Sequence, residues 1–393
     1  MNTQLSNNVR WVGYVDWSVR DFHGYRTERG STYNAYLVSG QKHALIDTVK
    51  APYAADLLAH VRALLPLEQL DYIVCNHAEP DHAGGLEQVV KACPNATVVC
   101  NKKCAEALRL HFDTSAWKFQ IVAEGEKLDL GGRTLQFFDT PMVHWPESMA
   151  TYLVEEQILF SMDAFGQHYA TSGRFDDEEP LDVVMAEAKT YYANIVMPYG
   201  RPVAAALAKL GALPLKMIAP SHGVIWRSHI GTIVAAYQDW MVCKSARKVV
   251  IVYASMWNST RVMAQAIASG ALESSVDVRL IDLDTVHDTE VVTEALDCAC
   301  LAIGSPTLNQ GIMPRMASAL TYLRGLRPTG KTGMAFGSYG WAARGCDELV
   351  QYLQAMQVAS LCEPITCRFR PDAATLEKCR EAGRLLARKA MEK

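Results

Sequence analysis

The chain has 393 residues, a length that favours two domains over a single core. Hydrophobic residues make up 50% of it and charged residues 20%, which is typical of a globular protein. The formal net charge of −4 gives no reason to expect a nucleic acid or a membrane surface as partner. The sequence shows neither a secretory signal nor an apolar run of membrane-spanning length, so we expect a cytoplasmic protein.

The first part of the chain predicts strands that alternate with short helices. Residues 29–48 predict two strands around a Ser-Gly turn. Residues 52–65 predict an amphipathic helix, because apolar side chains recur on one face. Further strand patterns occur at 70–76, 96–101, 118–141, 149–163 and 214–223, with helical patterns between 181 and 210.

A change of pattern near residues 243–248 marks the expected domain boundary. After it, strand and helix patterns alternate regularly and end in a helix from about residue 373, which favours a doubly wound parallel sheet. We therefore expect an α/β protein with domains at residues 1–245 and 246–393. The five expected strands of the second domain are 248–255, 277–283, 298–305, 331–338 and 363–369.

The strongest chemical signal is a set of four histidines and three carboxylates that follow strand-like stretches. An H-x-E-x-D-H motif comes directly after the apolar run at 70–76, and three further residues follow other strand patterns. Because strand ends converge at one edge of a packed sheet, these side chains can meet and hold two metal ions. The carboxylate share favours iron or manganese over zinc. The set is His77, Glu79, Asp81, His82, His144, Asp163 and His222.

Three loops at strand ends in the second half predict a flavin site. The first supplies hydroxyl, amide and backbone N–H groups at a predicted helix N-terminus, which favours a phosphate. It lacks the glycines of dinucleotide and Walker loops and resembles the flavodoxin phosphate loop, with Asn258 where a glycine is common. Trp257, Tyr339 and Trp341 are alternatives for flanking the flavin ring. We expect FMN to contact Ser255, Met256, Trp257, Asn258, Ser259, Thr260, Pro306, Thr307, Leu308, Asn309, Gln310, Ser338, Tyr339, Gly340 and Trp341.

The metal motif resembles the metallo-β-lactamase superfamily, whose common pattern is H-x-H-x-D-H-x-G. Glu79 stands where the second histidine usually stands, and one branch, the flavodiiron proteins, carries this substitution. The order of a metallo-β-lactamase-like half and a flavodoxin-like half is also that of the flavodiiron proteins. The segments RDFHGY, STYNAYL, HWPESM, DAFGQH and SPTLNQG resemble that family as well.

This resemblance implies an αββα sandwich followed by a flavodoxin-like sheet. It implies reduction of dioxygen to water, or of nitric oxide to nitrous oxide, at two irons, with FMN passing electrons from a donor such as rubredoxin. It also implies a head-to-tail homodimer or a dimer of dimers. One iron would take His77, Glu79 and His144, the other would take Asp81, His82 and His222, and Asp163 would bridge them.

Four residues are candidates for contacts with substrate or protons. His23, in the RDFHGY segment, is a candidate to reach the pocket, and His168 closely follows the Asp163 loop and is a candidate to orient Asp163 or to serve a proton path. Tyr191 and Tyr192 offer hydroxyl donors, with Tyr192 preferred. The alternatives are a loop hydrogen bond for His23 and ordinary core packing for the tyrosines.

Two other functions stay open at this point. One is a dizinc hydrolase with a flavodoxin-like appendage, which Glu79 and the flavin loops disfavour. The other is an electron-transfer or sensing module with a silent metal site, which the complete ligand set disfavours. The preference between dioxygen and nitric oxide is not visible in the sequence. The eleven cysteines include no C-x-x-C pair, so we expect free thiols and no fused rubredoxin module.

Overall fold

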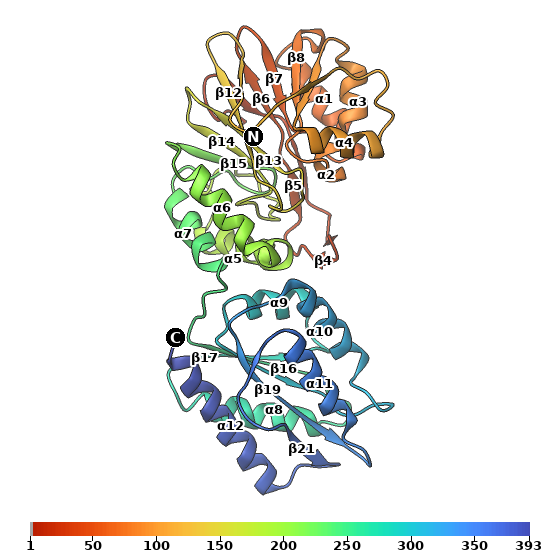
Figure 1. Cartoon of the computed structure of the whole chain (residues 1–393), viewed down its shortest axis with the longest axis vertical. Helices are drawn as coiled ribbons and strands as arrows, with labels where there is room; N and C mark the ends of the chain where they lie inside the picture. Colours follow the sequence, from red (N-terminus) through yellow and green to blue (C-terminus); the bar gives the residue numbers. More distant parts are fainter. Residues whose placement is uncertain (1–2) are drawn as a thin grey trace. The chain divides into compact units, whose positions relative to one another are not determined.

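The computed structural model describes residues 3–393, which form two compact units (Figure 1). The chain passes to the second unit at Gln238, slightly before the boundary expected at residue 245. The reason is that the following segment is tied to the second unit, where Lys331 Nζ donates to the carbonyl of Cys243 at 3.2 Å. The first unit is Met1–Tyr192 with Tyr199–Gln238, and the second is Ala193–Pro198 with Asp239–Lys393.

The first unit is a sandwich of two β-sheets with helices outside it, as the sequence predicted. The first sheet contains, in order, Val9–Trp11 (β1), Tyr36–Ser39 (β6), His43–Ile46 (β7), Leu70–Val74 (β8), Thr97–Cys100 (β9) and Phe119–Ile121 (β10). The second contains Lys127–Asp129 (β11), Thr134–Asp139 (β12), Met149–Leu153 (β13), Ile158–Met162 (β14) and Met217–Pro220 (β15). Two short ribbons pair Tyr14–Asp16 (β2) with Ser31–Tyr33 (β5), and Asp21–Phe22 (β3) with Tyr25–Arg26 (β4).

The helices that precede β16 (Lys248–Tyr253) lie between the strands in the chain order. They are Ala51–Tyr53 (η1), Ala54–Arg62 (α1), Leu67–Gln69 (η2), Pro80–Ala83 (α2), Leu86–Ala92 (α3), Lys102–His111 (α4), Leu181–Tyr191 (α5), Tyr192–Val196 (η3), Met197–Tyr199 (η4), Gly200–Leu210 (α6) and Ile230–Trp240 (α7). Within residues 3–393, every helix is too short or too polar to cross a membrane.

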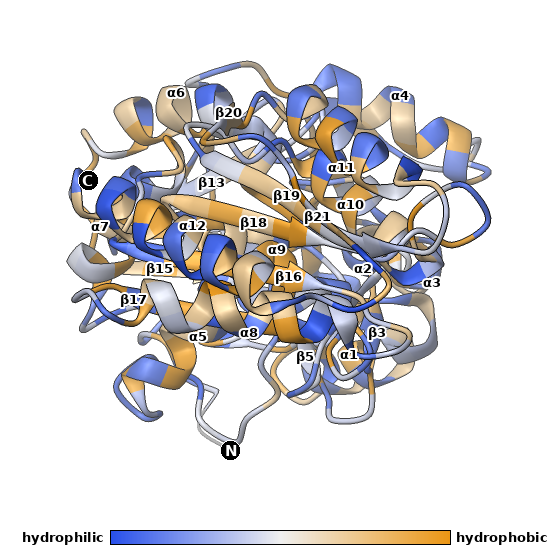
Figure 2. Ribbon diagram, turned by 90° about the horizontal axis from the view of Figure 1, so that it is seen from below, coloured by the Kyte–Doolittle hydropathy of each residue, from blue (hydrophilic) through white to orange (hydrophobic). Residues whose placement is uncertain are grey.

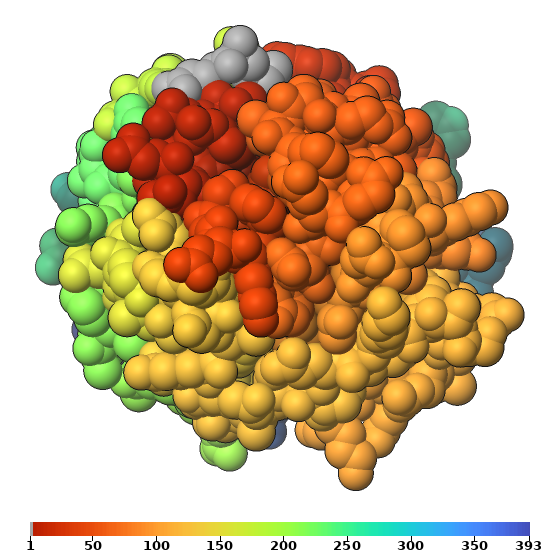
Figure 3. Space-filling model, turned by 90° about the horizontal axis from the view of Figure 1, so that it is seen from above, coloured from red at the N-terminus to blue at the C-terminus, as the bar shows by residue number. Residues whose placement is uncertain are grey.

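Three apolar layers hold the sandwich together. One layer packs α1, α3 and α4 against the first sheet, one fills the space between the sheets, and one packs Leu210 of α6 against the second sheet. Every residue of β13 and β14 is buried, because these strands are covered on both faces. On the face of this unit shown in Figure 3, the amino-terminal part of the chain (red to orange) and the part that follows it (yellow) cover adjoining areas.

The second unit is a parallel sheet with helices around it, and the five predicted strands are all present. Its order is Asp277–Asp282 (β17), Lys248–Tyr253 (β16), Cys300–Gly304 (β18), Thr332–Tyr339 (β19) and Ala359–Ser360 (β20), with Ile365–Arg368 (β21) also paired to β19. The helices are Ser259–Ala271 (α8), Asp288–Asp297 (α9), Pro314–Leu326 (α10), Arg344–Ala355 (α11) and Ala373–Met391 (α12). The strand order reverses direction beside β16, which is the switch point where such sheets bind ligands. Figure 2 shows the hydrophobic strands β16 and β18 among helices of mixed hydropathy.

The cysteines follow the prediction of free thiols. All eleven are unpaired by disulfides within residues 3–393, and nearly all are buried. Cys300 Sγ lies 3.3 Å from the Leu386 carbonyl, a packing position inside the second unit.

Candidate metal centre and flavin loops

Loops at one edge of the first unit carry the polar residues that the sequence singled out. Strands β12, β14 and β15 run in the same direction, because β13 is antiparallel to β12 and β14 while β14 is parallel to β15. His144, Asp163 and His222 each follow the carboxyl end of one of these three strands. His77 and Glu79 follow β8, and Asp81 and His82 lie in the short helix α2.

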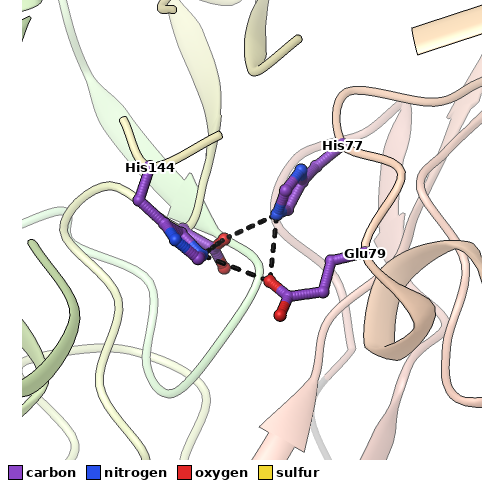
Figure 4. A group of neighbouring side chains, drawn as sticks. His77, Glu79 and His144 are labelled. Atoms are coloured by element: carbon purple, nitrogen blue, oxygen red, sulfur yellow. Dashed lines mark hydrogen bonds and ion pairs between the residues drawn. The ribbon is translucent and has the colours of Figure 1, made fainter. Parts of the chain in front are cut away.

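Four of these side chains form a first group. The oxygen Glu79 Oε2 lies 3.1 Å from His77 Nε2 and 3.2 Å from His144 Nε2, and the two imidazoles point toward this carboxylate (Figure 4). Asp163 Oδ2 lies 3.3 Å from His144 Nε2 and 3.5 Å from His77 Nε2. Two ligand atoms that are each about 2 Å from a common ion at right angles are roughly 3 Å apart. The spacing of this group therefore suits one metal ion.

A second group shares Asp163 with the first. Asp81 Oδ2 lies 3.1 Å from His82 Nε2 and 3.0 Å from His222 Nε2. The other oxygen of Asp163, Oδ1, lies 3.0 Å from His82 Nε2 and 3.5 Å from His222 Nε2. Asp163 thus presents one oxygen to each group, as a carboxylate that bridges two cations would.

The donor atoms of this site fit metal ions better than they fit one another. Within residues 3–393, both oxygens of Asp81, both oxygens of Asp163 and both ring nitrogens of His82 are buried without a hydrogen-bond partner, although His82 Nε2 lies within ion-pair distance of Asp81 Oδ2 and Asp163 Oδ1. Buried charged groups without partners are costly, and they are found where a cation compensates them. Glu79 differs from these residues, because its Oε2 lies within hydrogen-bond distance of both His77 and His144.

The pKa values show how strongly the cluster attracts positive charge. Burial would lower the pKa of His77, but its hydrogen bonds with Glu147 and Glu79 outweigh this effect and raise the pKa to about 10. Burial would raise the pKa of Glu79, but the bonds with His144 and His77 lower it to about 2. Without metal, protons on the imidazoles supply the positive charge, and a bound cation displaces them.

Hydrogen bonds behind the site orient its imidazoles. His77 Nδ1 lies 2.8 Å from Glu147 Oε1, which also accepts from the backbone N–H of Ala78 at 3.2 Å. His222 Nδ1 donates to the carbonyl of Thr32 at 2.6 Å. Such partners fix the tautomer, so that Nε2 faces the metal position. Glu147 is not among the residues predicted from the sequence, because its only signal there is its place three residues after His144.

The structure brings His23 and His168 to the site. His23 Nδ1 lies 3.3 Å from Glu79 Oε1. The His168 ring lies 4.6 Å from that of His222, and its Nδ1 lies 2.7 Å from Ser31 Oγ. Burial, with nearby His222, lowers the pKa of His168 well below its ordinary value, so its imidazole is neutral.

The choice of Tyr192 over Tyr191 does not fit the structure. The Tyr191 ring lies 5.0 Å from that of His168 and 5.9 Å from that of His222. Tyr192 instead packs against Tyr237, with 4.9 Å between ring centroids. The two residues are neighbours at the end of α5, and successive helical side chains point in different directions. The buried positions Val184, Ala188 and Tyr191 share a helical face, a signal that favours Tyr191.

The flavin candidates lie at the carboxyl ends of three neighbouring parallel strands. They occupy the loop after β16 with the start of α8, the loop after β18, and the end of β19 with the loop after it. Hydrogen bonds join these segments: Thr260 Oγ1 and Ser338 Oγ are 3.0 Å apart, and the Thr307 N–H donates to the Ser338 carbonyl at 2.8 Å. The three loops therefore form one surface at the switch point of the sheet.

This surface suits a phosphate and an aromatic ring. Asn258 precedes α8 with φ of 65°, the left-handed conformation that asparagine tolerates, and its side chain makes no cap bond in the described chain. The Arg261 N–H donates to Ser255 Oγ at 3.3 Å. The N–H groups of Ser259 and Thr260 at the start of α8 are the candidates for a phosphate. Trp257 and Trp341 are 82% and 87% exposed, so both are available to cover a ring. The residues fit FMN, and both tryptophans remain candidates for its faces.

Comparisons with known proteins agree with both halves of the chain. The family model described as ODP family beta lactamase matches residues 32–223, and the flavodoxin model matches residues 251–383. A nitric oxide reductase from Moorella thermoacetica is 41% identical over 388 residues, covering 98% of this chain and 97% of that protein. The chain belongs to the flavodiiron protein family.

Solved flavodiiron structures have the same fold throughout. The flavodiiron protein from Giardia intestinalis matches with a TM-score of 0.97 at 37% identity, covering 100% of this chain and 97% of that one. Rubredoxin oxygen:oxidoreductase from Desulfovibrio gigas matches with the same TM-score and identity, covering 100% and 99%. An anaerobic nitric oxide reductase flavorubredoxin from Escherichia coli is 39% identical over 395 residues, covering 99% of this chain and 82% of that protein. The hydrolase alternative finds no support among these relatives.

Proposed function

We propose that this flavodiiron protein reduces dioxygen to water, nitric oxide to nitrous oxide, or both, at a non-haem diiron centre that receives electrons through FMN. The observation that carries this function is the pair of ligand groups that share Asp163. Its relatives are named for reactions of nitric oxide and of oxygen, and its second unit has the flavodoxin fold. It is an oxidoreductase whose electrons come from a redox partner.

The ligand assignment follows the two groups. His77, Glu79 and His144 would hold one iron, and Asp163 would bridge to the other. The second iron would take Asp81, His82 and His222. The distances of 3.0–3.5 Å between neighbouring donor atoms support this division.

Bound together, two ferrous ions and a reduced FMN supply the four electrons that reduction of dioxygen to two waters requires. The chain's own residues orient the ligands and provide protons. Glu147 and the Thr32 carbonyl hold His77 and His222 in the tautomer that presents Nε2. The Tyr191 hydroxyl would stay protonated and available as a hydrogen-bond donor, because burial, with the nearby Asp163 charge, raises its pKa well above the usual value. His23 and His168 also lie beside candidate ligands, His23 next to Glu79 and His168 next to His222.

The flavin assignment rests on the three joined loops. The phosphate would lie at the N-terminus of α8, against Ser255 and the segment Asn258–Thr260. The ring would lie beside 306–310 and 338–341. We propose residues 1–245 and 246–393 as the metal-binding and FMN-binding domains.

We propose that the electron donor is rubredoxin or a similar small redox protein, and that two chains form a head-to-tail homodimer, alone or in a dimer of dimers. The metal and flavin residues belong to separate units of the chain. Electron transfer requires the two cofactors to be close, and a two-fold pair would place the flavin of one chain against the irons of its partner.

The test is metal counting combined with gas consumption. The purified protein is reduced without oxygen, its iron and zinc are measured, and its consumption of dioxygen and of nitric oxide is followed in parallel. Two irons per chain with consumption of either gas support the proposal. Zinc alone with hydrolysis of an ester or thioester would support the dizinc hydrolase instead.

A further inference from the structure

Three tyrosine rings lie in series, starting beside the candidate ligand His222. Tyr14 and Tyr33 are cross-strand partners in the ribbon of β2 and β5, and Tyr53 lies in η1. The Tyr33 ring lies 5.9 Å from that of His222 and 5.6 Å from that of Tyr53. Tyr53 in turn stacks on Tyr14 at 3.8 Å. Tyr33 is fully buried, whereas Tyr53 and Tyr14 are partly exposed.

The carboxylate of Asp16 accepts hydrogen bonds from two of these phenols. Asp16 Oδ2 accepts a hydrogen bond from Tyr53 Oη at 2.8 Å and one from Tyr33 Oη at 3.3 Å. Asp16 Oδ1 accepts from the Ser18 and Val19 N–H groups at 3.1 Å, which fixes the carboxylate in place. A phenol loses an electron most readily when its proton has an acceptor at hydrogen-bond distance. Asp16 is that acceptor, and it is nearly buried.

The charge of Lys50 makes Tyr33 harder to oxidise than Tyr53, which favours electron transfer from Tyr53 to Tyr33. Lys50 Nζ lies 4.9 Å from the centroid of the Tyr33 ring, and a cation makes the neighbouring ring harder to oxidise. Tyr53 has the shorter bond to the Asp16 carboxylate and no cation placed over its ring among the described contacts. An oxidising equivalent that reaches Tyr33 would therefore be more stable on Tyr53, which is the next ring in the series that starts at His222.

We propose that Tyr33, Tyr53 and Tyr14, with Asp16 as proton acceptor, form an electron relay that returns electrons from a reductant in solution to an over-oxidised metal centre. The relay would act when reduced FMN is exhausted during dioxygen reduction. It would protect the ligands and the fold from oxidation, a function separate from the reduction of the gases. This inference rests on the proposed dioxygen chemistry at the site.

Electrons and protons balance across the relay. Tyr33 would give one electron to the metal site and would be restored by one electron from Tyr53, as the Tyr53 proton moves to Asp16 at 2.8 Å. Tyr14 would pass an electron to Tyr53, which takes its proton back from Asp16, and the oxidised Tyr14 would release its own phenol proton to solvent. A thiol in solution would then give one electron and one proton to Tyr14 and restore its hydroxyl group. Two such thiols join as one disulfide. They deliver two electrons to the metal centre and release two protons, which the reduction of dioxygen to water consumes.

The experiment traps tyrosyl radicals by rapid freezing and detects them by electron paramagnetic resonance. Iron- and FMN-loaded protein containing ring-deuterated tyrosine is given too few electrons for complete turnover, mixed with dioxygen and frozen rapidly. In a second arm, the reduced protein receives hydrogen peroxide without dioxygen. We expect a tyrosyl radical in wild type that a thiol removes quickly. In Tyr53→Phe, the thiol should no longer remove the oxidising equivalent, and mass spectrometry should find added oxygen on residues around the metal site.

The controls separate the relay from a structural role. Tyr72→Phe removes another partly exposed tyrosine of the same unit, bonded to Lys42, and should behave as wild type. Initial rates of gas consumption should be the same in Tyr53→Phe, Tyr14→Phe and wild type, while the number of turnovers before inactivation should fall severalfold in the two relay variants.

Failure of the relay and failure of dioxygen reduction give different results. Dioxygen consumption without a tyrosyl radical in either arm, or a Tyr53→Phe protein that a thiol rescues as fast as wild type, overturns the relay. A radical in the peroxide arm from a protein that consumes no dioxygen keeps the relay and overturns dioxygen reduction as the function. Absence of both dioxygen consumption and radical overturns both.

Discussion

The two candidate cofactor sites of this chain differ in how deeply their side chains are buried. The metal-site carboxylates Asp81 and Asp163 are buried, and their donor atoms already face common points. At the flavin loops, Trp257 and Trp341 are almost fully exposed. A buried, charged ligand set is costly without cations, whereas an exposed loop surface tolerates an absent ligand. Changes at the first region should therefore disturb metal and fold together, and changes at the second should remove only the flavin.

The most severe test of this contrast is Asp163→Ala. The change removes both oxygens that connect the two ligand groups. We expect loss of at least one metal per chain and complete loss of gas reduction, with FMN still bound. Metal analysis, flavin absorbance and gas consumption measure the three effects. Asp182→Ala alters an exposed aspartate of the same unit and should change none of them. A variant that keeps both metals and full turnover would show that Asp163 is not a bridge.

The matching change in the second region is the double variant Ser259→Ala with Thr260→Ala. Both residues lie in the first turn of α8, where the phosphate is expected. We expect loss of FMN with both irons retained, and a flavin released by heating wild type should be FMN. Recovery of FAD would contradict the phosphate-loop assignment.

These two regions also test the head-to-tail dimer. A His144→Ala chain lacks a working iron site, and the phosphate-loop variant lacks FMN. If each flavin serves the irons of its partner, mixing the two inactive proteins restores one complete site in each heterodimer. Activity from a verified monomer, or no recovery in verified heterodimers, would rule out this arrangement.

A smaller effect is expected behind the metal site. Glu147→Gln keeps the shape of the residue that bonds His77 Nδ1 but removes its charge. Outer partners of metal-bound histidines typically contribute about 10–100-fold to metal affinity, and we expect a loss in that range for one iron only. Competition with a chelator measures it. Glu155→Gln is the matched control, since that carboxylate accepts the Thr134 N–H far from the site. Equal affinity in wild type and Glu147→Gln would make Glu147 dispensable.

The sequence predicted that the seven candidate ligands would lie together, and the structure groups them, because they lie in the segments that directly follow β8, β12, β14 and β15. It predicted the αββα and flavodoxin-like architecture because long apolar strands have clear patterns. It missed β1 to β4, which have only two or three residues each and no detectable period. Residues such as Glu147 and Asp16 act through side chains brought together from distant segments. No local spacing distinguishes them from ordinary surface carboxylates.

The smallest predicted effect concerns stability rather than cofactors. Burial raises the pKa of Glu187 to about 7, although the nearby Arg29 lowers it, and the Glu187 side chain is 17% exposed. The folded state therefore holds this proton more tightly than the unfolded chain does, and stability falls as the pH rises from about 4.5 to about 7.

Glu187→Gln removes this titration, so the variant should gain stability over wild type as the pH rises through that window. The gain has an upper bound of about 3 kcal/mol at about 1.4 kcal/mol per pKa unit, and loss of the pairing with Arg29 reduces it. Urea unfolding of both proteins on either side of the window measures the difference, and Glu106→Gln, at an exposed position, should show none. A gain of the same size below about pH 4.5 would be inconsistent with titration, because both side chains are then neutral. Such a result would assign the effect to packing around Arg29 instead.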